Sequence, residues 1–283
     1  MNWVLTAIGA ATMTYITAPM FLELLRRSGA VRNNYLGESV PVAGGFLLLW
    51  MGCLWVLISS FSSLSQDYRF MANPGLLIGL AGLGFGFMGL VDDILGSREQ
   101  SGLVGHLREL FTGRLTTGAL KALLGVAFGL VLAMGRGWVG PSPLAVRLSM
   151  LVVDGLLIAG SANLLNLLDL RPGRAGKSFL LGAFAVIGWG NPMSLLVLPF
   201  VGGLIGFLPY DLKGQAMMGD TGANGLGAVL GLTALYAFHF RIRLLLLVAI
   251  LAIHIVAERV SLSKVIEEFP PLKALDRWGR PDP

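Results

Sequence analysis

The chain has 283 residues, of which 55% are hydrophobic and 13% are charged, and its mean hydropathy is +0.74. This composition excludes a soluble globular domain, in which about a quarter of the residues are charged. The single cysteine, Cys53, excludes an internal disulfide and a cysteine metal cluster. The formal net charge of +5 is typical of a membrane protein with its basic residues on one side, so no nucleic-acid partner is expected.

Apolar segments of the length that crosses a lipid bilayer follow one another along the chain. They predict an all-α, polytopic membrane helix bundle of about nine transmembrane helices in residues 1–258, followed by a cytoplasmic polar tail in residues 259–283. The predicted spans are 2–22, 41–61, 72–91, 117–135, 145–167, 178–190, 193–209, 222–239 and 243–258. The boundary between the sixth and seventh spans rests on the turn-forming sequence "GWGNPMS" alone.

The basic residues decide the predicted orientation. With the N-terminus outside and the C-terminus in the cytoplasm, sixteen of the 21 Lys and Arg residues lie on the inner side. The five on the outer side are Arg69, Arg136, Arg147, Arg241 and Arg243. All acidic residues except Asp67 and Asp154 fall on the inner side too, so chemistry is expected at the cytoplasmic face. Asp154 lies a few residues into a span, where pairing with Arg147 is the expected arrangement.

Two motifs on this face come early in the chain. Pro41, Gly44 and Gly45 belong to "VPVAGG" at the start of the second span, and Asp92 and Asp93 end the third span in "GLVDDILG". The C-terminal end of a helix carries partial negative charge, which disfavours acids there. A positive group that neutralises the two aspartates is therefore expected nearby.

Two further motifs come later. In "NLLNLLD", Asn163, Asn166 and Asp169 are three residues apart, so on a helix the two asparagines share a face. In "MGDTGANGLG", Asp220 stands at the start of the eighth span, the position of a helix N-terminal group.

Carboxylates from several loops thus gather on one side of the membrane. Carboxylates without thiols and with few histidines are ligands for a hard cation, and Mg²⁺ is the usual partner of a diphosphate substrate. Four cations are candidates for holding phosphate oxygens: Lys121, Arg171, Arg174 and Lys177.

Each of these features also has a structural interpretation. Adjacent acids after a span often begin a solvated loop, and asparagines on a membrane helix often bond to a neighbouring helix. The basic residues at 171–177 follow from the orientation alone or anchor the loop to anionic lipid, and Asp220 alone would be an N-cap. Their joint occurrence between glycine-rich helix ends favours a phosphate site.

The four motifs, in this order and at these intervals, resemble the polyprenyl-phosphate N-acetylhexosamine-1-phosphate transferase family (glycosyltransferase family 4) from about residue 38 to residue 232. The resemblance implies a multi-pass helical protein of the bacterial cytoplasmic membrane, with an active site that faces the cytoplasm and depends on Mg²⁺ (or Mn²⁺). It implies that polyprenyl phosphate attacks the sugar-linked phosphorus of a UDP-sugar, giving a polyprenyl-diphosphate sugar for cell wall biogenesis and UMP. Its partners would be polyprenyl phosphate, a nucleotide sugar, the lipid bilayer and a second copy in a homodimer.

Carried over to this sequence, the resemblance assigns catalysis to Asp92 and Asp93, with Asp92 as the base or the partner of polyprenyl phosphate. It assigns metal binding to Asp220 and Asp93. The substrate-binding residues it implies are Lys121, Asn163, Asn166 and Asp169. Arg171, Arg174 and Lys177 are added to this set because their positive charges follow directly after Asp169.

The chain departs from the family pattern in the half of the site that reads the base and the sugar. Pro172 stands where the family has a second aspartate, and Asp211 replaces an asparagine. The histidine-rich loop near the C-terminus is missing, and the polar tail takes the place of the usual tenth span. The metal and diphosphate half keeps its motifs.

The leading hypothesis is an Mg²⁺-dependent phosphoglycosyl transferase. A non-catalytic relative that binds polyprenyl phosphate as a scaffold or regulator would explain the altered nucleoside contacts. A third hypothesis is a lipid or ion transporter, and it rests on the nine predicted spans and the intramembrane acid Asp154.

Overall fold

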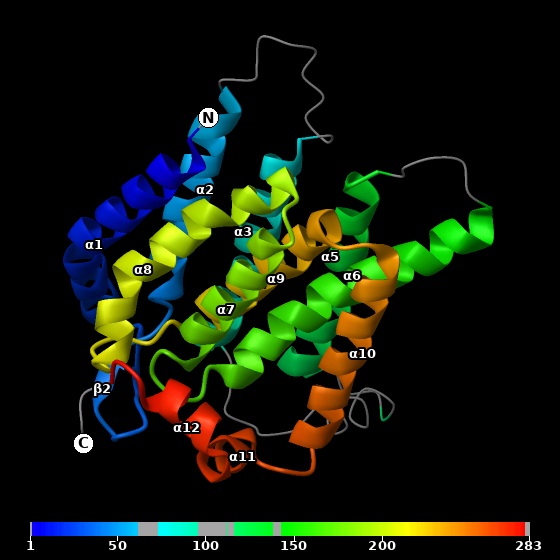
Figure 1. Ribbon diagram of the computed structural model, residues 1–283. Helices are drawn as coiled ribbons and strands as arrows, with labels where there is room; N and C mark the ends of the chain where they lie inside the picture. Colours follow the sequence, from blue (N-terminus) through cyan, green and yellow to red (C-terminus); the bar gives the residue numbers. More distant parts are fainter. Residues whose placement is uncertain (1, 62–72, 96–111, 113–115, 138–142, 281–283) are drawn as a thin grey trace.

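The computed structural model describes residues 2–61, 73–95, 112, 116–137 and 143–280, and Asp67 and Arg69 lie outside these residues. The described part is a bundle of helices with one short hairpin, which confirms the all-α prediction (Figure 1). The helices are α1 (Trp3–Arg27), α2 (Gly45–Phe61), α3 (Pro74–Leu95), α5 (Thr117–Gly135), α6 (Leu144–Leu168), α7 (Arg174–Gly188), α8 (Leu198–Leu212), α9 (Gly219–Ala237), α10 (Phe240–Ala257), α11 (Leu262–Glu268) and α12 (Pro270–Arg277). A 3-10 helix, η2 (Pro192–Val197), precedes α8, and the strands β1 (Val31–Asn33) and β2 (Ser39–Pro41) pair antiparallel.

Each of the nine predicted spans overlaps one of these helices. Six segments of the described chain are long and apolar enough to cross a membrane: Trp3–Arg27, Pro74–Leu95, Gly118–Gly135, Leu144–Leu168, Pro192–Leu212 and Phe240–Ala257. The remaining three predicted spans correspond to α2, whose apolar part is Gly45–Ser59, to α7 with 15 residues, and to α9. The count of nine and the orientation stay predictions.

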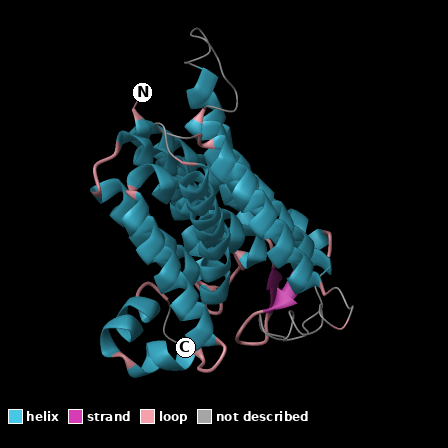
Figure 2. Ribbon diagram, turned by 90° about the vertical axis from the view of Figure 1, so that its right-hand side faces the viewer, coloured by secondary structure: helices cyan, strands magenta, loops and turns pink. Residues whose placement is uncertain are grey.

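The helices form two groups around a central helix. In Figure 1, α1, α2 and α8 lie on one side, α5, α6 and α10 lie on the other, and α9 runs between them against α3, α6 and α7. The tail, expected only as a polar segment, folds into α11 and α12. These two helices and the hairpin lie at the same end of the bundle (Figure 2).

Small residues let α9 occupy the centre, and nearly all of its residues are buried. A Cβ added at Gly89 of α3 would lie 2.2 Å from the backbone oxygen of Asp220. A Cβ added at Gly45 of α2 would lie 2.2 Å from the Cα of Gly222. These backbone-to-backbone approaches fix where the N-terminal end of α9 meets its neighbours.

The "VPVAGG" motif pairs with the segment that leads into α9. The backbone N–H of Met217 donates to the oxygen of Pro41 at 2.9 Å, and the N–H of Gly45 donates to the oxygen of Met218 at 2.9 Å. Ala43, between them, has a φ of 62°, which places a residue other than glycine in the left-handed region. Two motifs far apart in the sequence therefore form one backbone layer beside the first turn of α9.

The expected pairing of Asp154 with Arg147 is wrong. Asp154 of α6 forms ion pairs with Arg243 of α10 and, at 3.6 Å, with Arg136 after α5. Arg147 lies two turns away from Asp154, about 10 Å along the same helix axis, whereas α5 and α10 pack directly beside α6.

The packing predicts that Gly89→Ala destabilises the fold, because the new methyl group meets backbone atoms that no rotamer change can move. We expect a loss of about 1–3 kcal/mol in the free energy of unfolding, measured as a lower thermal midpoint of the purified protein in detergent. Gly188→Ala in α7 is the matched control, since nothing lies within 4 Å of its added Cβ. Equal midpoints for the two variants would contradict the close approach of α3 and α9.

Candidate active site

The second of the two adjacent aspartates caps the central helix. Asp93 Oδ1 accepts from the backbone N–H of Asp220 at 3.1 Å, and Asp93 Oδ2 accepts from the backbone N–H of Thr221 at 2.9 Å and from its Oγ1 at 2.6 Å. Asp93 is only 4% exposed. The N-terminal end of α9 offers unpaired N–H groups and partial positive charge, and both stabilise a carboxylate there. The positive group expected beside Asp93 is therefore a helix end.

The first aspartate faces a lysine. Lys121 of α5 places its Nζ 3.3 Å from Asp92 Oδ2 and in direct contact with Asp220 Oδ2. Asn166 of α6 donates from Nδ2 to the same oxygen of Asp220 at 3.1 Å. Asp92 and Asp220 keep side-chain exposures of 29% and 28%, whereas Asp93 is far less exposed and is engaged by its three hydrogen bonds. One ammonium group thus bridges two carboxylates from different helices.

Asp169, which ends α6, completes a carboxylate cluster that consists of Asp92, Asp93, Asp169 and Asp220. Burial raises the pKa of Asp169 well above its usual value, and the negative charges of Asp211, Asp220 and Asp93 raise it further. A hydrogen bond from the backbone of Gly219 lowers this pKa in part. Burial and the neighbouring carboxylates thus disfavour the charged form of Asp169, and a bound cation would favour it.

A polar pocket of about 300 Å³ opens beside this cluster. The hairpin region contributes Arg32 and Tyr35, the loop between α6 and α7 contributes Asp169 and Arg171, and Asp220 also lines it. The guanidinium of Arg171 lies 5.0 Å from the centre of the Tyr35 ring, a cation–π distance. Asp93 and Asp220 of the cluster line the pocket, so an anionic part of a substrate there would meet both basic groups beside these carboxylates.

The side chains of the carboxylate cluster suit a divalent metal whose other ligands are phosphate oxygens of a substrate. Within the described residues, no three acidic, His or Cys side chains already stand at metal-ligand spacing. Mg²⁺, however, is commonly held by one or two carboxylates plus substrate phosphates. The ammonium group of Lys121 lies between Asp92 and Asp220, where a cation neutralises both carboxylates. Of the two metal ligands that the resemblance implies, Asp93 already accepts three hydrogen bonds at its oxygens, and Asp220 contacts Lys121 and Asn166.

Two of the predicted phosphate-binding cations bind the C-terminal tail. Arg174 donates from Nε and Nη2 to the two carboxylate oxygens of Asp276 in α12, at 2.7 and 3.2 Å. Lys177 donates to three backbone oxygens at the end of α12, at 2.8, 2.6 and 3.1 Å. Such contacts satisfy the last carbonyl groups of a helix. Arg174 and Lys177 are both buried, and of the three cations in this loop only Arg171 lines the polar pocket.

The tail also holds the loop between α6 and α7 in place. Arg280 donates to the backbone oxygen of Pro172 at 2.7 Å and to Asp276 at 2.7 Å. The buried Asp211 accepts from the backbone N–H of Gly173 at 2.9 Å, and Gly173 has a φ of 72°. The residues that replace the family pattern therefore meet at one turn, since Pro172 lies in the turn and Asp211 of α8 accepts a hydrogen bond from it.

Asn163 does not contact the cluster. Its Nδ2 lies 2.7 Å from Nε2 of His254 in α10, so it links α6 to α10, and only Asn166 reaches Asp220. Sequence reasoning missed Tyr35 and Asp276, which lie in segments that carry no family motif. One signal was present for α12, because a proline in the first turn before an amphipathic run is typical of a helix start.

The tail contacts predict that Asp276→Asn frees α11 and α12. Removing one partner of a buried ion pair costs about 3 kcal/mol, which corresponds to roughly 100-fold in the docking equilibrium. Limited trypsin cleavage at Lys273 should therefore be much faster in this variant. Glu267→Gln, at an exposed position of α11, is the control. A cleavage rate equal to that of the wild type would contradict the docking.

The same docking should depend on pH. Burial raises the pKa of Asp276, but the hydrogen bonds and charges of Arg174 and Arg280 lower it in net below its usual value. Because this pKa is lowered, the ion pairs of Asp276 contribute fully to docking at pH values above the ordinary aspartate pKa. Their contribution is lost as the pH falls through the lowered pKa. Tail protection measured with an acid-tolerant protease should decrease in that window, and protection that persists well below it would contradict the ion pair.

Comparison with known proteins finds a family and several transferases that resemble this sequence. The sequence model of glycosyl transferase family 4 matches residues 75–238, which include α3 to α9 and the carboxylate cluster. The phospho-N-acetylmuramoyl-pentapeptide-transferase of Heliobacterium modesticaldum is 30% identical over 93% of this chain and 79% of its own length. The transferases of the same name from Desulforudis audaxviator and Halalkalibacterium halodurans are 29% and 26% identical, each over 82% of this chain, and 75% and 74% of their own lengths are covered. The resemblance seen in the motifs is confirmed.

Proposed function

The chain belongs to glycosyl transferase family 4, and from this premise we propose that it transfers a sugar-1-phosphate from a nucleotide sugar to polyprenyl phosphate. The observation that carries the proposal is the bridge of Lys121 between Asp92 and Asp220 at the edge of the polar pocket. The donor is a UDP-N-acetylhexosamine or a close relative, and the product is a polyprenyl-diphosphate sugar for cell-envelope glycans. The protein lies in the bacterial cytoplasmic membrane with the carboxylate cluster toward the cytoplasm.

The reaction requires little covalent chemistry from the protein. An oxygen of polyprenyl phosphate forms a bond to the phosphorus that carries the sugar, the bond from this phosphorus to the bridging oxygen breaks, and a nucleoside monophosphate leaves. Catalysis of this kind is mainly alignment of the two phosphates and stabilisation of negative charge. Lys121 supplies a positive charge, and Asn166 orients Asp220 by a hydrogen bond.

Asp92 and Asp220 would hold a divalent metal, Mg²⁺ or Mn²⁺, which would neutralise charge on the diphosphate. Lys121 lies beside both carboxylates and would donate to a phosphate oxygen. Arg171 reaches the donor from the wall of the polar pocket, where its planar group can form paired hydrogen bonds to a phosphate.

Turnover tests this proposal directly. Purified protein supplied with undecaprenyl phosphate, a panel of nucleotide sugars and Mg²⁺ should release a nucleoside monophosphate and form the diphosphate-linked lipid, and a chelator should stop the reaction. Asp220→Asn should lower kcat/KM at least about 100-fold, because it removes a carboxylate that would hold the divalent metal at the reacting phosphates. Glu267→Gln makes the same charge change at an exposed site and should leave the rate unchanged. Absence of turnover across the panel by folded protein would overturn the proposal.

Arg171, in the loop before α7, and Arg174, the first residue of α7, should behave differently. Arg171→Gln should raise the donor's KM about tenfold without lowering the thermal midpoint, because it removes a charged hydrogen bond to the donor phosphates. Arg174→Gln should chiefly lower the midpoint and expose the tail to trypsin, because Asp276 loses its bidentate partner. The assignment fails if Arg174→Gln raises KM while the tail stays protected.

A further inference from the structure

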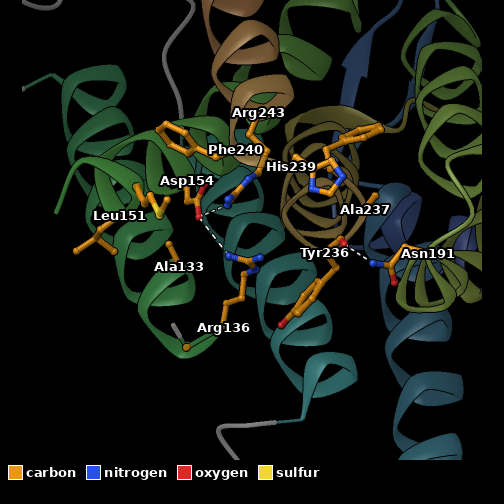
Figure 3. Close-up of a pocket in the computed structure, with 13 residues that line it drawn as sticks. Ala133, Arg136, Leu151, Asp154, Asn191, Tyr236, Ala237, His239, Phe240 and Arg243 are labelled. Carbon is orange, nitrogen blue, oxygen red and sulfur yellow. Dashed lines mark hydrogen bonds and ion pairs between the residues drawn. The ribbon is translucent and has the colours of Figure 1, made fainter. Parts of the chain in front are cut away.

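A second charged cavity lies at the opposite end of the helices from the carboxylate cluster. Its volume is about 350 Å³, and it is bounded by the C-terminal ends of α5 and α9 and the first turn of α10 (Figure 3). The carboxylate cluster, in contrast, lies at the N-terminal ends of α5 and α9. The cavity contains Arg136, Asp154 and Arg243, and we call it the arginine pocket.

The arginine pocket holds two cations and one anion. Figure 3 shows the guanidinium groups of Arg136 and Arg243 directed at the carboxylate of Asp154 from two different elements. Asp154 is 4% exposed and Arg243 is 5% exposed, and Asp154 is the one acid among the described residues that line the pocket. Among these residues, one positive charge therefore has no counter-charge. An unpaired charge in a buried setting is costly, so the pocket favours an additional anion.

Hydrogen-bonding capacity leads to the same conclusion. Each guanidinium carries five N–H donors and no acceptor, and both arginines contact the same oxygen, Oδ2, of Asp154. Within the described residues, Arg243 Nε has no hydrogen-bond partner. Arg136 keeps 23% of its side chain exposed, so its guanidinium is the one that an incoming ligand reaches first. Asp154 Oδ1, an acceptor in the same pocket, also has no hydrogen-bond partner within the described residues. One carboxylate offers about four acceptor sites against ten N–H donors of the two guanidinium groups, so donors remain in excess.

The other residues that line the arginine pocket indicate the chemistry of the rest of the ligand. Tyr236, Phe238, Phe240 and Leu151 line the pocket, and the guanidinium of Arg136 lies 5.8 Å from the centre of the Tyr236 ring. A volume of about 350 Å³ is at the lower end of the range of small-molecule sites, which leaves room for more than a bare oxyanion. Apolar and aromatic walls around a cationic base suit an anionic head with an apolar neighbour.

We infer that the arginine pocket binds a phosphate group, through Arg136 with Arg243 behind it. Arginine pairs with phosphate through two parallel hydrogen bonds, which the surplus donors can supply. The phosphate can belong to a lipid headgroup or to a soluble phosphate. These residues are remote from the carboxylate cluster, so phosphate binding here does not depend on the proposed transferase activity.

The test is a thermal melting titration of the full-length protein in detergent. The probes are inorganic phosphate at constant ionic strength, phosphatidic acid, and phosphatidylcholine as the lipid of zero net charge. Phosphate or phosphatidic acid should raise the midpoint of the wild type by mass action, and phosphatidylcholine should not. A response to inorganic phosphate identifies a soluble ligand as sufficient, and a response to phosphatidic acid alone identifies the lipid headgroup.

Variants with opposite expected effects separate binding from a structural role. Arg136→Gln should weaken the apparent affinity at least about tenfold, and Arg136→Lys should give an intermediate value. Asp154→Asn should tighten it, because the competing carboxylate is gone and the pocket then holds two cations without a counter-charge. Arg241→Gln is the matched control, since it makes the same change at an exposed position of the same helix turn as Arg243.

The same titration of Arg171→Gln measures how much of the response comes from phosphate bound in the polar pocket, at the other end of the molecule. Phosphate binding in the arginine pocket is ruled out if no probe stabilises the wild type, or if Arg136→Gln responds to phosphate as the wild type does. If Asp154→Asn does not fold, the comparison of the Gln and Lys variants of Arg136 with Arg241→Gln still decides the outcome.

Discussion

The carboxylate of Asp93 lies between two helix ends, where it accepts three hydrogen bonds from the first turn of α9. This junction places the acidic end of α3 against the positive end of the central helix. Gly219 begins α9 with a φ of 72°, and a Cβ there would lie 2.5 Å from Asp93 Oδ2. Glycine is therefore required at this position both by the backbone conformation and by the contact.

The rest of the site follows from this junction. Because Asp93 and Gly89 fix α3 against α9, Asp220 is held where it meets Lys121 of α5 and Asn166 of α6. Two adjacent aspartates thus have different tasks, since Asp93 is engaged by the fold and its neighbour stays open to a ligand. The crowding of carboxylates at this place would suit the divalent metal that we propose.

The helices and the cluster could be predicted from the sequence, because apolar length and short motifs are local properties. The partners of single side chains could not. Asp154 pairs across helices rather than along its own helix, and Arg174 binds Asp276, a residue far away in the sequence. Such pairs depend on how the helices pack and on where the tail docks, and neither leaves a periodic pattern. The separate tasks of Asp92 and Asp93 were hidden for the same reason, because only the position of α9 distinguishes them.

The central claim is that the two adjacent aspartates divide structure and chemistry between them. The most direct measurement compares Asp92→Asn with Asp93→Asn by thermal melting and by the electron paramagnetic resonance signal of Mn²⁺ bound in the presence of UDP. We expect that Asp93→Asn lowers the melting midpoint, because α9 loses its cap, whereas Asp92→Asn keeps the midpoint and loses Mn²⁺ binding. An Asp92→Asn protein that binds Mn²⁺ as the wild type does, or an Asp93→Asn protein that melts as the wild type does, would contradict this division.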